Sequence, residues 1–378
     1  MHQTDYDIAI IGGGLAGLSL AILAADAKYS VALFEKEEYP FHKVCGEYIS
    51  LESHDFFKRL GLCLDDWNLP VIKKLQVSDL KGKTYNFNLD LGGFGVSRYT
   101  IDNALYELAK QKAVSVFTNE KVNDINFEND HHSIKANKKT VTAKIAAGAF
   151  GKRSNLDIRW KRSFAEKKTK KLNNYIGVKY HIKTSFPKDR IALHNFKHGY
   201  CGISAIEDDK YCLCYLTTAQ NLSANNNSIQ QMQKNVLYKN ASLKKLFTES
   251  EFLYDAPLTI SQISFEQKSQ TQNHVLLLGD AAGMITPLCG NGMSMALHAS
   301  KLVFEEAGIF LQQKISREQM ESNYVIKWKK QFASRLATGR MVQRFMGNEF
   351  STGVFLKLMK AFPFLSQTVI RSTHGKTF

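Results

Sequence analysis

The sequence has no long hydrophobic run. None of its 378 residues belongs to a stretch near the ~18 consecutive apolar residues that a membrane-spanning helix needs. No signal peptide precedes the first predicted strand, because residues 1–5 are polar and lead directly into it. We therefore expect a cytoplasmic protein, with peripheral attachment to the inner face of a membrane as a second option. The chain also has no internal repeat and no low-complexity segment.

Cysteine is scarce, and its spacing does not indicate a metal site. One close pair, Cys212 and Cys214, falls in a predicted strand where both thiols face the same side, and no second pair completes a zinc set. The histidines have neither triad nor metal spacing. We therefore predict that this pair is reduced and buried and that no metal is bound. The six cysteines are Cys45, Cys63, Cys201, Cys212, Cys214 and Cys289.

Acidic residues are in deficit. Lys and Arg number 50 against 35 Asp and Glu, a net charge of +15, and residues 301–378 alone hold 13 basic and 5 acidic residues, a net charge of +8. A second basic run extends from Lys161 to Lys171. Such charge is typical either of solvated surface loops or of a surface that meets an anionic partner such as a membrane. The basic runs lack interleaved aromatic residues, which argues against a nucleic-acid partner.

The N-terminal stretch carries the strongest motif. A buried, β-branched run leads into Gly12, Gly14 and Gly17, spaced G-x-G-x-x-G, and a helix and a second strand ending in Glu35 follow. Gly12 permits a tight turn, Gly14 lets a pyrophosphate approach the backbone, and Gly17 lets the helix pack closely on the strand. Glu35 is placed to accept hydrogen bonds from a ribose hydroxyl. A structural turn without a ligand is the alternative, but the full context favours an adenine-dinucleotide site.

A second motif follows a buried strand near the end of the chain. The apolar run 275–278 ends in Gly279 and Asp280, which places a carboxylate at the carboxyl edge of the sheet, where ligands of such sheets bind. Asp280 can accept a hydrogen bond from a sugar-alcohol hydroxyl. Gly290 and Gly292 let backbone amides approach a flat ring system, and the positive end of the following helix faces that ring. An ordinary strand-to-helix turn would not explain two such motifs in one chain.

These patterns predict an α/β fold with three parts. Residues 1–75, 96–157 and 265–310 would form a discontinuous Rossmann-type dinucleotide-binding domain. Residues 76–95 and 158–264, where strand-like alternation dominates, would form an inserted antiparallel β substrate domain. A basic helical region, residues 311–378, would complete the chain.

Individual elements follow from periodicity and capping. Helices are predicted over residues 51–62, ending at Gly61, and over residues 101–110, with Thr100 as N-cap. Strands are predicted within residues 71–91, 114–118, 134–141, 175–182, 200–206 and 211–217.

The last predicted helices carry an apolar stripe. It consists of Val354, Phe355, Leu358, Met359 and Phe362, which recur at helical spacing. Lys357 and Lys360 fall off that face, and Pro363 breaks the run, so two short helices are predicted rather than one. The stripe fits either a core face that caps the substrate domain or a monotopic anchor on an anionic membrane surface.

Together the two glycine motifs, with Arg98 before a helix, resemble the FAD-binding scaffold of the para-hydroxybenzoate hydroxylase superfamily. The runs Lys43-Val44-Cys45-Gly46 and Gly279-Asp280-Ala281-Ala282-Gly283 look most like its geranylgeranyl reductase and FixC-like branch, and flavin-dependent halogenases are more distant relatives. The resemblance covers residues 1–157 and 265–310. It implies FAD as cofactor, reduced by NAD(P)H or by a protein electron donor that binds only transiently, because no second dinucleotide fingerprint is present.

The resemblance also implies roles for single residues. The implied cofactor-binding residues are Gly12, Gly14, Leu15, Ala16, Gly17, Glu35, Lys36, Lys43, Cys45, Arg98, Val122, Gly279, Asp280, Gly290, Asn291, Gly292 and Met293. Cys45 lies where the branch places a cysteine near the flavin, which makes it the catalytic candidate. It could donate a proton, or act as a thiolate beside a cation such as Lys43, and an inert buried cysteine is the alternative.

Several residues differ from the family patterns, and these differences limit the types of reaction that the resemblance implies. Phe150 stands where the aromatic hydroxylases carry an Asp, and Gly283 where they carry a His, which weakens the case for hydroxylase handling of NAD(P)H. The reductase branch often shows an aromatic substrate motif, whereas this chain has the run Gly199–Ser204. The resemblance therefore does not identify the substrate.

The leading functional prediction is an FAD-dependent oxidoreductase that acts on a hydrophobic substrate, of isoprenoid, lipid or polyketide type. The reaction would be hydride transfer through the flavin at a carbon–carbon double bond. A flavin monooxygenase that hydroxylates or epoxidises an aromatic or lipid substrate is the alternative among enzymes. A basic membrane-surface or nucleic-acid binder that retains a flavin fold is the alternative from another class.

Overall fold

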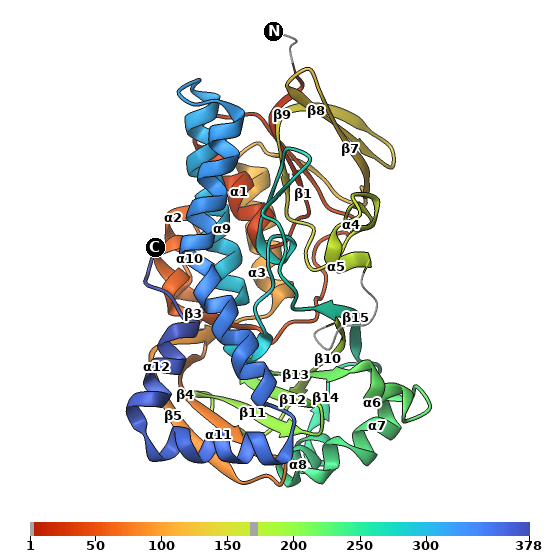
Figure 1. Ribbon diagram of the computed structural model, residues 1–378, viewed down its shortest axis with the longest axis vertical. Helices are drawn as coiled ribbons and strands as arrows, with labels where there is room; N and C mark the ends of the chain where they lie inside the picture. The colour runs from red at the N-terminus through yellow and green to blue at the C-terminus, as the bar shows by residue number, and fades with distance from the viewer. Residues whose placement is uncertain (1–3, 167–172) are drawn as a thin grey trace.

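The computed structural model describes residues 4–166 and 173–378. Residues 167–172, the end of the predicted basic run, lie outside them. The described chain forms two sheets stacked along the long axis of the molecule (Figure 1). The first sheet and its helices form the upper half, the second sheet forms the lower half, and a long helix, α10 (Arg317–Phe345), runs alongside both.

The first sheet contains β1, which the first glycine motif follows, and β17, which the second glycine motif follows. Its strands follow the order β16-β17-β9-β1-β2-β6, parallel except at β16, and β8 joins β7 to β9 as an antiparallel extension. Ile8 and Ile10 are fully buried because β1 is covered on both faces, which explains its continuous apolar run. The strands are β1 (Tyr6–Ile11), β2 (Val31–Phe34), β6 (Ser115–Phe117), β7 (Val122–Glu128), β8 (His131–Ala136), β9 (Thr140–Gly148), β16 (Thr271–Gln272) and β17 (Val275–Leu277).

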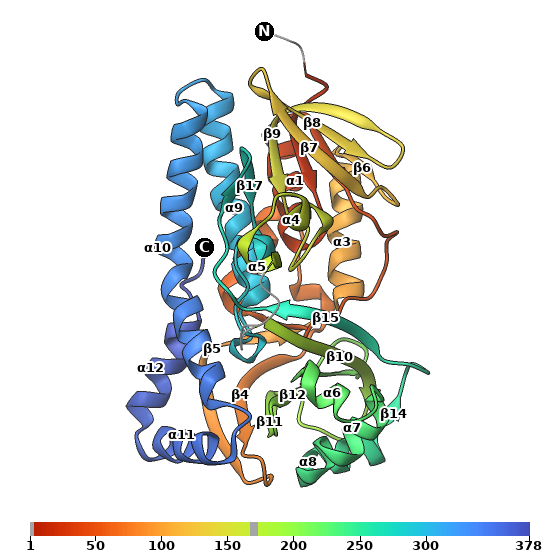
Figure 2. The same cartoon turned by 45° about the vertical axis from the view of Figure 1, so that its right-hand side comes forward.

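Two layers of helices cover this sheet. The helix α1 (Leu15–Asp26) packs between the sheet and α9 (Gly292–Leu311), and it also contacts α3 (Arg98–Gln111). Residues 15–24 of α1 are all buried, so this helix has no polar face. Figure 2 shows α10 on the outside of α9. The shorter helices are α2 (His54–Leu60), α4 (Asn155–Arg159), α5 (Ser163–Glu166), α6 (Ala219–Ser223), α7 (Ile229–Asn235) and α8 (Ala241–Glu249).

The second sheet follows the order β14-β10-β13-β12-β11-β4-β5-β3, with β15 also paired to β10. Its described pairs are antiparallel apart from β4–β11. Its strands are β3 (Tyr48–Ser50), β4 (Val71–Ser78), β5 (Thr84–Gly95), β10 (Asn173–Lys183), β11 (Arg190–Phe196), β12 (Gly199–Ala205), β13 (Tyr211–Thr218), β14 (Glu251–Phe252) and β15 (Leu258–Ser264). The strand β3 and most of β4 fall within residues 1–75, which the sequence assigned to the dinucleotide-binding domain, yet both pair in this sheet.

Alternation along β10 gives the second sheet two different faces. Val178 and Tyr180 point into a core that includes Leu243 and Phe247 of α8. Lys179 points the other way and reaches a carbonyl oxygen of the loop between β2 and β3. The sheet therefore packs on its own helices with one face and meets the first half of the molecule with the other.

The chain ends in two helices, α11 (Glu349–Ala361) and α12 (Pro363–Thr373), and the predicted break at Pro363 is confirmed. Leu356 of α11 packs against Val77 and Tyr85 of the second sheet. Within the described residues, no single helix is long and apolar enough to cross a membrane. Only α11 and α12 taken together pass that test, and they are bent by 109° relative to each other.

Two local predictions were wrong, and one was confirmed. Ser97, not Thr100, is the N-cap of α3, because the Ser97 hydroxyl accepts the hydrogen bond from the Thr100 amide at 3.1 Å. Residues 134–141 form two strands of a hairpin rather than one, since the Ala136 amide bonds the Lys139 carbonyl and closes a turn. The predicted end at Gly61 is confirmed, with a left-handed φ of 99°.

The contact between α1 and β1 predicts a sharp response at Gly17. A Cβ atom there would lie 2.0 Å from the Gly12 carbonyl oxygen. We expect Gly17→Ala to lower the free energy of unfolding by about 3 kcal/mol or more, because α1 must move away from the sheet. Urea unfolding with excess FAD measures this. The control is Gly353→Ala in α11, whose Cβ meets nothing within 4 Å and should cost nothing. Equal stability of both variants would contradict the packing.

Candidate functional site

The N-terminus of α1 is the first part of the site. Gly14 is its N-cap and offers no side-chain hydrogen bond, and the first turn holds no acidic residue, so the end amides keep their positive potential. A Cβ built on Gly14 would lie 3.4 Å from Arg98 Nη2 and 3.7 Å from Lys43 Nζ. Gly12, with a φ of 107°, holds the preceding turn. Two cations and a bare helix end thus meet at one point, which suits a phosphate group.

Asp102 fixes these two cations. It accepts from Arg98 Nε and Nη2, both at 2.7 Å, and from Lys43 Nζ at 2.9 Å. Burial alone would raise the pKa of Asp102, but the charges of Arg98 and Lys43 outweigh burial and hold it below its usual value. Two cations thus share one carboxylate, which holds their positive groups beside Gly14. Sequence reasoning found both cations and missed Asp102, four residues after Arg98 on the same helix face.

Glu35 lies at the end of β2, buried beside the glycine turn. Its Oε2 accepts from the Gly13 amide at 2.8 Å, and its Oε1 accepts from the Glu37 amide at 3.1 Å. The Tyr39 hydroxyl donates to the Gly13 carbonyl, and its ring stacks on Tyr106 with 4.3 Å between centroids. Glu35 therefore shapes the turn itself, and its predicted contact with a ribose stays a prediction.

Other predicted contacts lie near this turn or at the surface. Leu15 and Ala16 are buried in the first turn of α1. Val122 is buried on β7, where its carbonyl accepts from Asn155 Nδ2 at 3.3 Å. Lys36 is exposed and pairs with Glu37 at 3.2 Å, so the structure does not bring it to the glycine turn.

The turn after β17 forms the second part of the site. Gly279 has a φ of 60°, and Asp280 follows it. Burial raises the pKa of Asp280, and the charges of Lys268 and Arg98 oppose this only in part. Lys268 Nζ donates to the Asp280 carbonyl at 2.7 Å and so holds the turn in place. A small cavity of about 10 Å³ is lined by Asp280 together with Gly279 and Gly292. The desolvated carboxylate is suited to accept a hydroxyl hydrogen bond.

The N-terminus of α9 is the third part. Gly290 has a φ of 65°, and the N-cap Asn291 makes no capping hydrogen bond. Its Nδ2 donates to the Thr373 carbonyl at 2.9 Å, while its buried Oδ1 has no partner among the described residues. The Cys45 thiol donates to Met293 Sδ at 3.6 Å. Cys45 and the predicted ring-binding residues are therefore neighbours.

A buried ionic cluster joins the two sheets beside these residues. Glu47, fully buried, accepts from the Arg98 amide at 2.8 Å and from Lys179 Nζ at 2.5 Å, and it pairs with His181 Nε2 at 2.6 Å. Burial alone would raise the pKa of Glu47, but the hydrogen bond with His181 and the charge of Lys179 hold it below its usual value. Sequence reasoning missed this cluster. The available signals were Glu47 directly after Gly46, and a lysine within the apolar strand β10.

This cluster contains donor types that also bind metals. The donor atoms of Glu47, His181 and Cys212 lie within 4.8 Å of one another. However, the Lys179 ammonium already supplies the positive charge, and burial keeps the pKa of the Cys212 thiol well above its ordinary value. Cys212 donates to the Cys45 carbonyl at 3.2 Å, consistent with the predicted reduced thiol. The group is therefore better described as an ion-pair network than as a metal centre.

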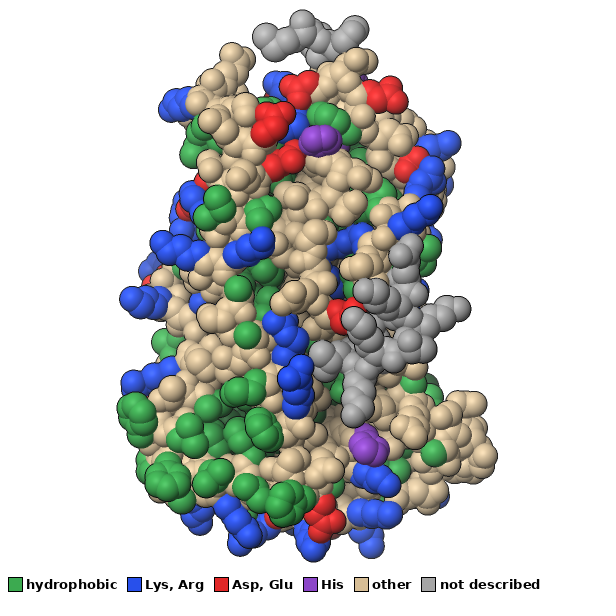
Figure 3. Space-filling view, viewed as in Figure 1, with side chains coloured by type: hydrophobic (Ala, Val, Ile, Leu, Met, Phe, Trp, Pro, Cys, Tyr) green, Lys and Arg blue, Asp and Glu red, His purple; other side chains and the backbone are tan. Residues whose placement is uncertain are grey.

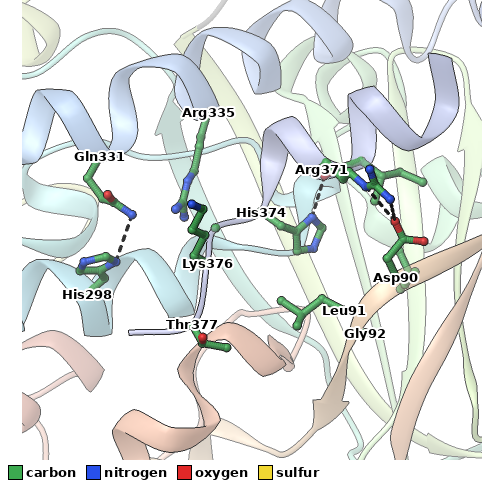
Figure 4. A pocket seen from close by; sticks show the side chains of 13 residues that line it. Asp90, Leu91, Gly92, His298, Gln331, Arg335, Arg371, His374, Lys376 and Thr377 are labelled. Carbon is green, nitrogen blue, oxygen red and sulfur yellow. Dashed lines mark hydrogen bonds and ion pairs between the residues drawn. The ribbon is translucent and has the colours of Figure 1, made fainter. Parts of the chain in front are cut away.

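A separate pocket of about 680 Å³ opens between β5, α9, α10, α12 and the C-terminal residues (Figure 4). Gln331 lies 3.3 Å from His298 on one side, and Arg371 pairs with Asp90 at 2.8 Å on the other. None of the predicted cofactor-binding residues lines it. The candidate cofactor site is thus identified by the charges and hydrogen-bonding groups of its residues, and it does not coincide with the 680 Å³ pocket.

The chain matches the family model described as FAD binding domain over residues 5–305, and it belongs to this family. The cofactor of the protein is FAD. The protein is a flavoprotein of the oxidoreductase and monooxygenase superfamily that includes para-hydroxybenzoate hydroxylase.

The chain is similar to proteins of several kinds. Conditioned medium factor receptor 1 of Dictyostelium discoideum is 24% identical over 345 residues, and the match covers 79% of this chain and 62% of that protein. A geranylgeranyl bacteriochlorophyll reductase-like protein from Thermoplasma acidophilum aligns with a TM-score of 0.78 and 16% identity, covering 99% of this chain and 96% of its own. The flavin-dependent brominase Bmp2 aligns with a TM-score of 0.77 and 18% identity, covering 97% and 93%. These likenesses establish the fold and not the branch.

The residues of the site fit FAD in three places. The bare end of α1 with Arg98 and Lys43 suits the pyrophosphate, and the desolvated Asp280 suits a ribityl hydroxyl. The end of α9, with the unpartnered Asn291 Oδ1, suits the polar edge of the flavin ring. When bound there, FAD supplies hydride transfer. The residue assignments themselves stay predictions.

Gly14 allows the pyrophosphate assignment to be tested without loss of the fold. Because a Cβ at this position meets only the ends of Arg98 and Lys43 at ordinary contact distances, Gly14→Val should fold. Its side chain would occupy the phosphate position, so we expect protein with little or no FAD, measured as the ratio of flavin to protein absorbance and by far-UV circular dichroism. A folded variant with full flavin occupancy would show that the phosphate binds elsewhere.

Cys45 is predicted to be a thiol rather than a thiolate. Burial raises its pKa, and the charge of Arg98 opposes this only in part. We therefore expect iodoacetamide to leave Cys45 unmodified between about pH 7 and pH 8, because only thiolates react quickly. The exposed Cys63 serves as the internal control, and peptide mass spectrometry reads both sites. Modification of Cys45 as fast as that of Cys63 would restore the thiolate interpretation.

Proposed function

We propose that the protein is an FAD-dependent oxidoreductase that reduces, or in the reverse direction forms, a carbon–carbon double bond in a hydrophobic substrate. One observation carries the proposal. An apolar cluster from the second sheet, with Tyr200, Leu216 and Phe265 in its buried part, contacts Leu288, two residues before Gly290. This cluster makes the surroundings of the residues assigned to the flavin ring apolar rather than charged. Such surroundings favour a long isoprenoid, lipid or polyketide-like chain over a small polar substrate.

The burial that raises the pKa of the Cys45 thiol favours its protonated form, which supports the reductive direction. Reduction of a double bond takes up one hydride at one carbon and one proton at the other, so a proton donor is needed beside the flavin. The Cys45 thiol holds a proton on Sγ, at 3.6 Å from Met293 Sδ. The thiolate left after transfer would be stabilised by the charge of Arg98, which already acts to lower the pKa of this thiol. Solvent can then restore the proton.

Phe150 supports a reductase over a hydroxylase. Its ring packs against Trp160, with 6.1 Å between the centroids, and provides no carboxylate at the position where the aromatic hydroxylases carry one. We infer that NAD(P)H or a protein electron donor reduces the flavin without a trigger from the substrate. The resemblance to the geranylgeranyl reductase branch agrees with this order of events, and the reductase-like structural neighbour is compatible with it.

A reductase and a monooxygenase differ in what reoxidises the reduced flavin and in whether the substrate triggers flavin reduction. We expect the holoprotein, reduced by dithionite without oxygen, to be reoxidised by a lipid that carries a geranylgeranyl chain, with a saturated bond in the product. Flavin absorbance and mass spectrometry of the lipid measure this. Under air, an aromatic substrate should not accelerate reduction by NADPH.

Cys45→Ala should slow reoxidation by the lipid by about 100-fold, the usual worth of a general acid, and leave reduction by dithionite unchanged. Cys63→Ala is the matched control, because Cys63 is exposed and lies outside the site. Substrate-triggered reduction of the flavin with stoichiometric uptake of oxygen would instead establish a monooxygenase.

A further inference from the structure

The two C-terminal helices expose large apolar side chains. We call these residues the tail patch: Phe350, Val354, Leu358, Phe362, Phe364 and Leu365. Phe350 and Phe364 are 81% and 82% exposed, the highest values among the large hydrophobic residues of the described chain. Figure 3 shows hydrophobic side chains gathered over α11 and α12, at the lower left of the molecule. A contiguous apolar surface of this kind usually marks an interaction site.

The tail patch is a second apolar face and not the core face of α11. Leu356 and Met359 are buried, and the Phe355 ring stacks on Phe345 with 5.4 Å between centroids. The predicted stripe therefore divides. Phe355 and Met359 turn inward, whereas Leu358 is 45% and Phe362 is 58% exposed. The core interpretation holds for the inner side of the helix, and the membrane-anchor interpretation of the outer side stays a prediction. The packing leaves the outer side available to a partner.

Positive charge accompanies the tail patch. Lys357 and Lys360 lie exposed on α11 and form no ion pair with the described part of the chain. Figure 3 also shows Lys and Arg side chains around the hydrophobic group. A second copy of this chain seated on the same patch would bring these cations toward their own equivalents. An anionic lipid surface would complement both the apolar and the positive groups.

We propose that the tail patch docks on the surface of an anionic lipid bilayer. The aromatic rings enter the interfacial region, and Lys357 and Lys360 meet the headgroups. The helices α11 and α12 have 13 and 11 residues and are bent by 109°, so they lie on the bilayer rather than cross it. Docking does not depend on the reaction. Ile370, on another side of α12, lines the 680 Å³ pocket.

Vesicle binding by the full-length holoprotein tests the proposal. With vesicles of equal parts phosphatidylcholine and phosphatidylglycerol, we expect co-sedimentation that weakens in high salt and with phosphatidylcholine alone. The double variant Phe350→Ser, Phe364→Ser should reduce the partition coefficient at least about tenfold, because two exposed rings no longer enter the interface. The double variant Lys357→Glu, Lys360→Glu should bind anionic vesicles weakly at every salt concentration.

Matched controls lie on α10. Ile326 is 62% exposed, and Ile326→Ser removes an exposed apolar side chain outside the tail patch. Lys329→Glu with Lys330→Glu repeats the charge change on exposed positions. Both controls should bind like the wild type, and flavin absorbance verifies that each variant is folded. Binding by the Phe350/Phe364 variant at wild-type strength would overturn the proposal. A second outcome would also overturn it: the wild-type protein does not bind anionic vesicles and is a dimer in sedimentation velocity, while the Phe350/Phe364 variant is a monomer. That outcome would assign the tail patch to a second copy of the chain.

Discussion

The buried carboxylate of Glu47 is the contact on which the relation between the two sheets depends. One oxygen accepts from the amide that begins α3 and from Lys179 of the second sheet, and the other pairs with His181 of the same sheet. Loss of one partner from such a buried network costs about 3–5 kcal/mol, although an apolar replacement of the whole network is often neutral. The network therefore contributes less to the free energy of unfolding than to the placement of the second sheet relative to α3. It sets the second sheet against the residue, Arg98, that lies closest to Gly14.

From His181 the same network of hydrogen bonds continues toward the surface through Tyr254 and His42. His181 Nδ1 lies 2.6 Å from the Tyr254 hydroxyl, which lies 3.1 Å from His42 Nε2. Burial lowers the pKa of His42 to about 4, with the charge of Lys179 adding to this, so the outer end of the chain is neutral near pH 7. Positive charge stays at Lys179, where Glu47 balances it. Lys43 and Arg98, which share the carboxylate of Asp102, are then the cations that face Gly14, where a phosphate would contact them.

The sequence predicted those parts of the fold that local chemistry determines. The glycine turn, the buried strands, the stop at Gly61 and the break at Pro363 each follow from backbone sterics or burial of a short run, and each is confirmed. Contacts between distant segments were not predictable in the same way. Asp102 looks like an ordinary helical acid, and Lys179 looks like one polar residue in a strand, until the fold brings them to Lys43 and Glu47. The two faces of α11 were also hidden, because helical spacing gives an apolar stripe but not the surface that covers it.

The features that mark the site are the ones that a structural protein would avoid. Two helices begin without a capping hydrogen bond: α1 has Gly14 at its N-cap, and at α9 the side chain of Asn291 bonds Thr373 instead of the helix. Asp280 is desolvated, and the Asn291 amide oxygen is buried without a partner among the described residues. Each of these costs stability in the protein alone, and we expect each to be compensated by one part of a dinucleotide that carries phosphates, hydroxyls and a polar ring edge. Gly14 and Asp280 follow the ends of β1 and β17, which both pair with β9, and Gly292 at the start of α9 lines the same small cavity as Asp280. A single extended cofactor can therefore reach all of these groups.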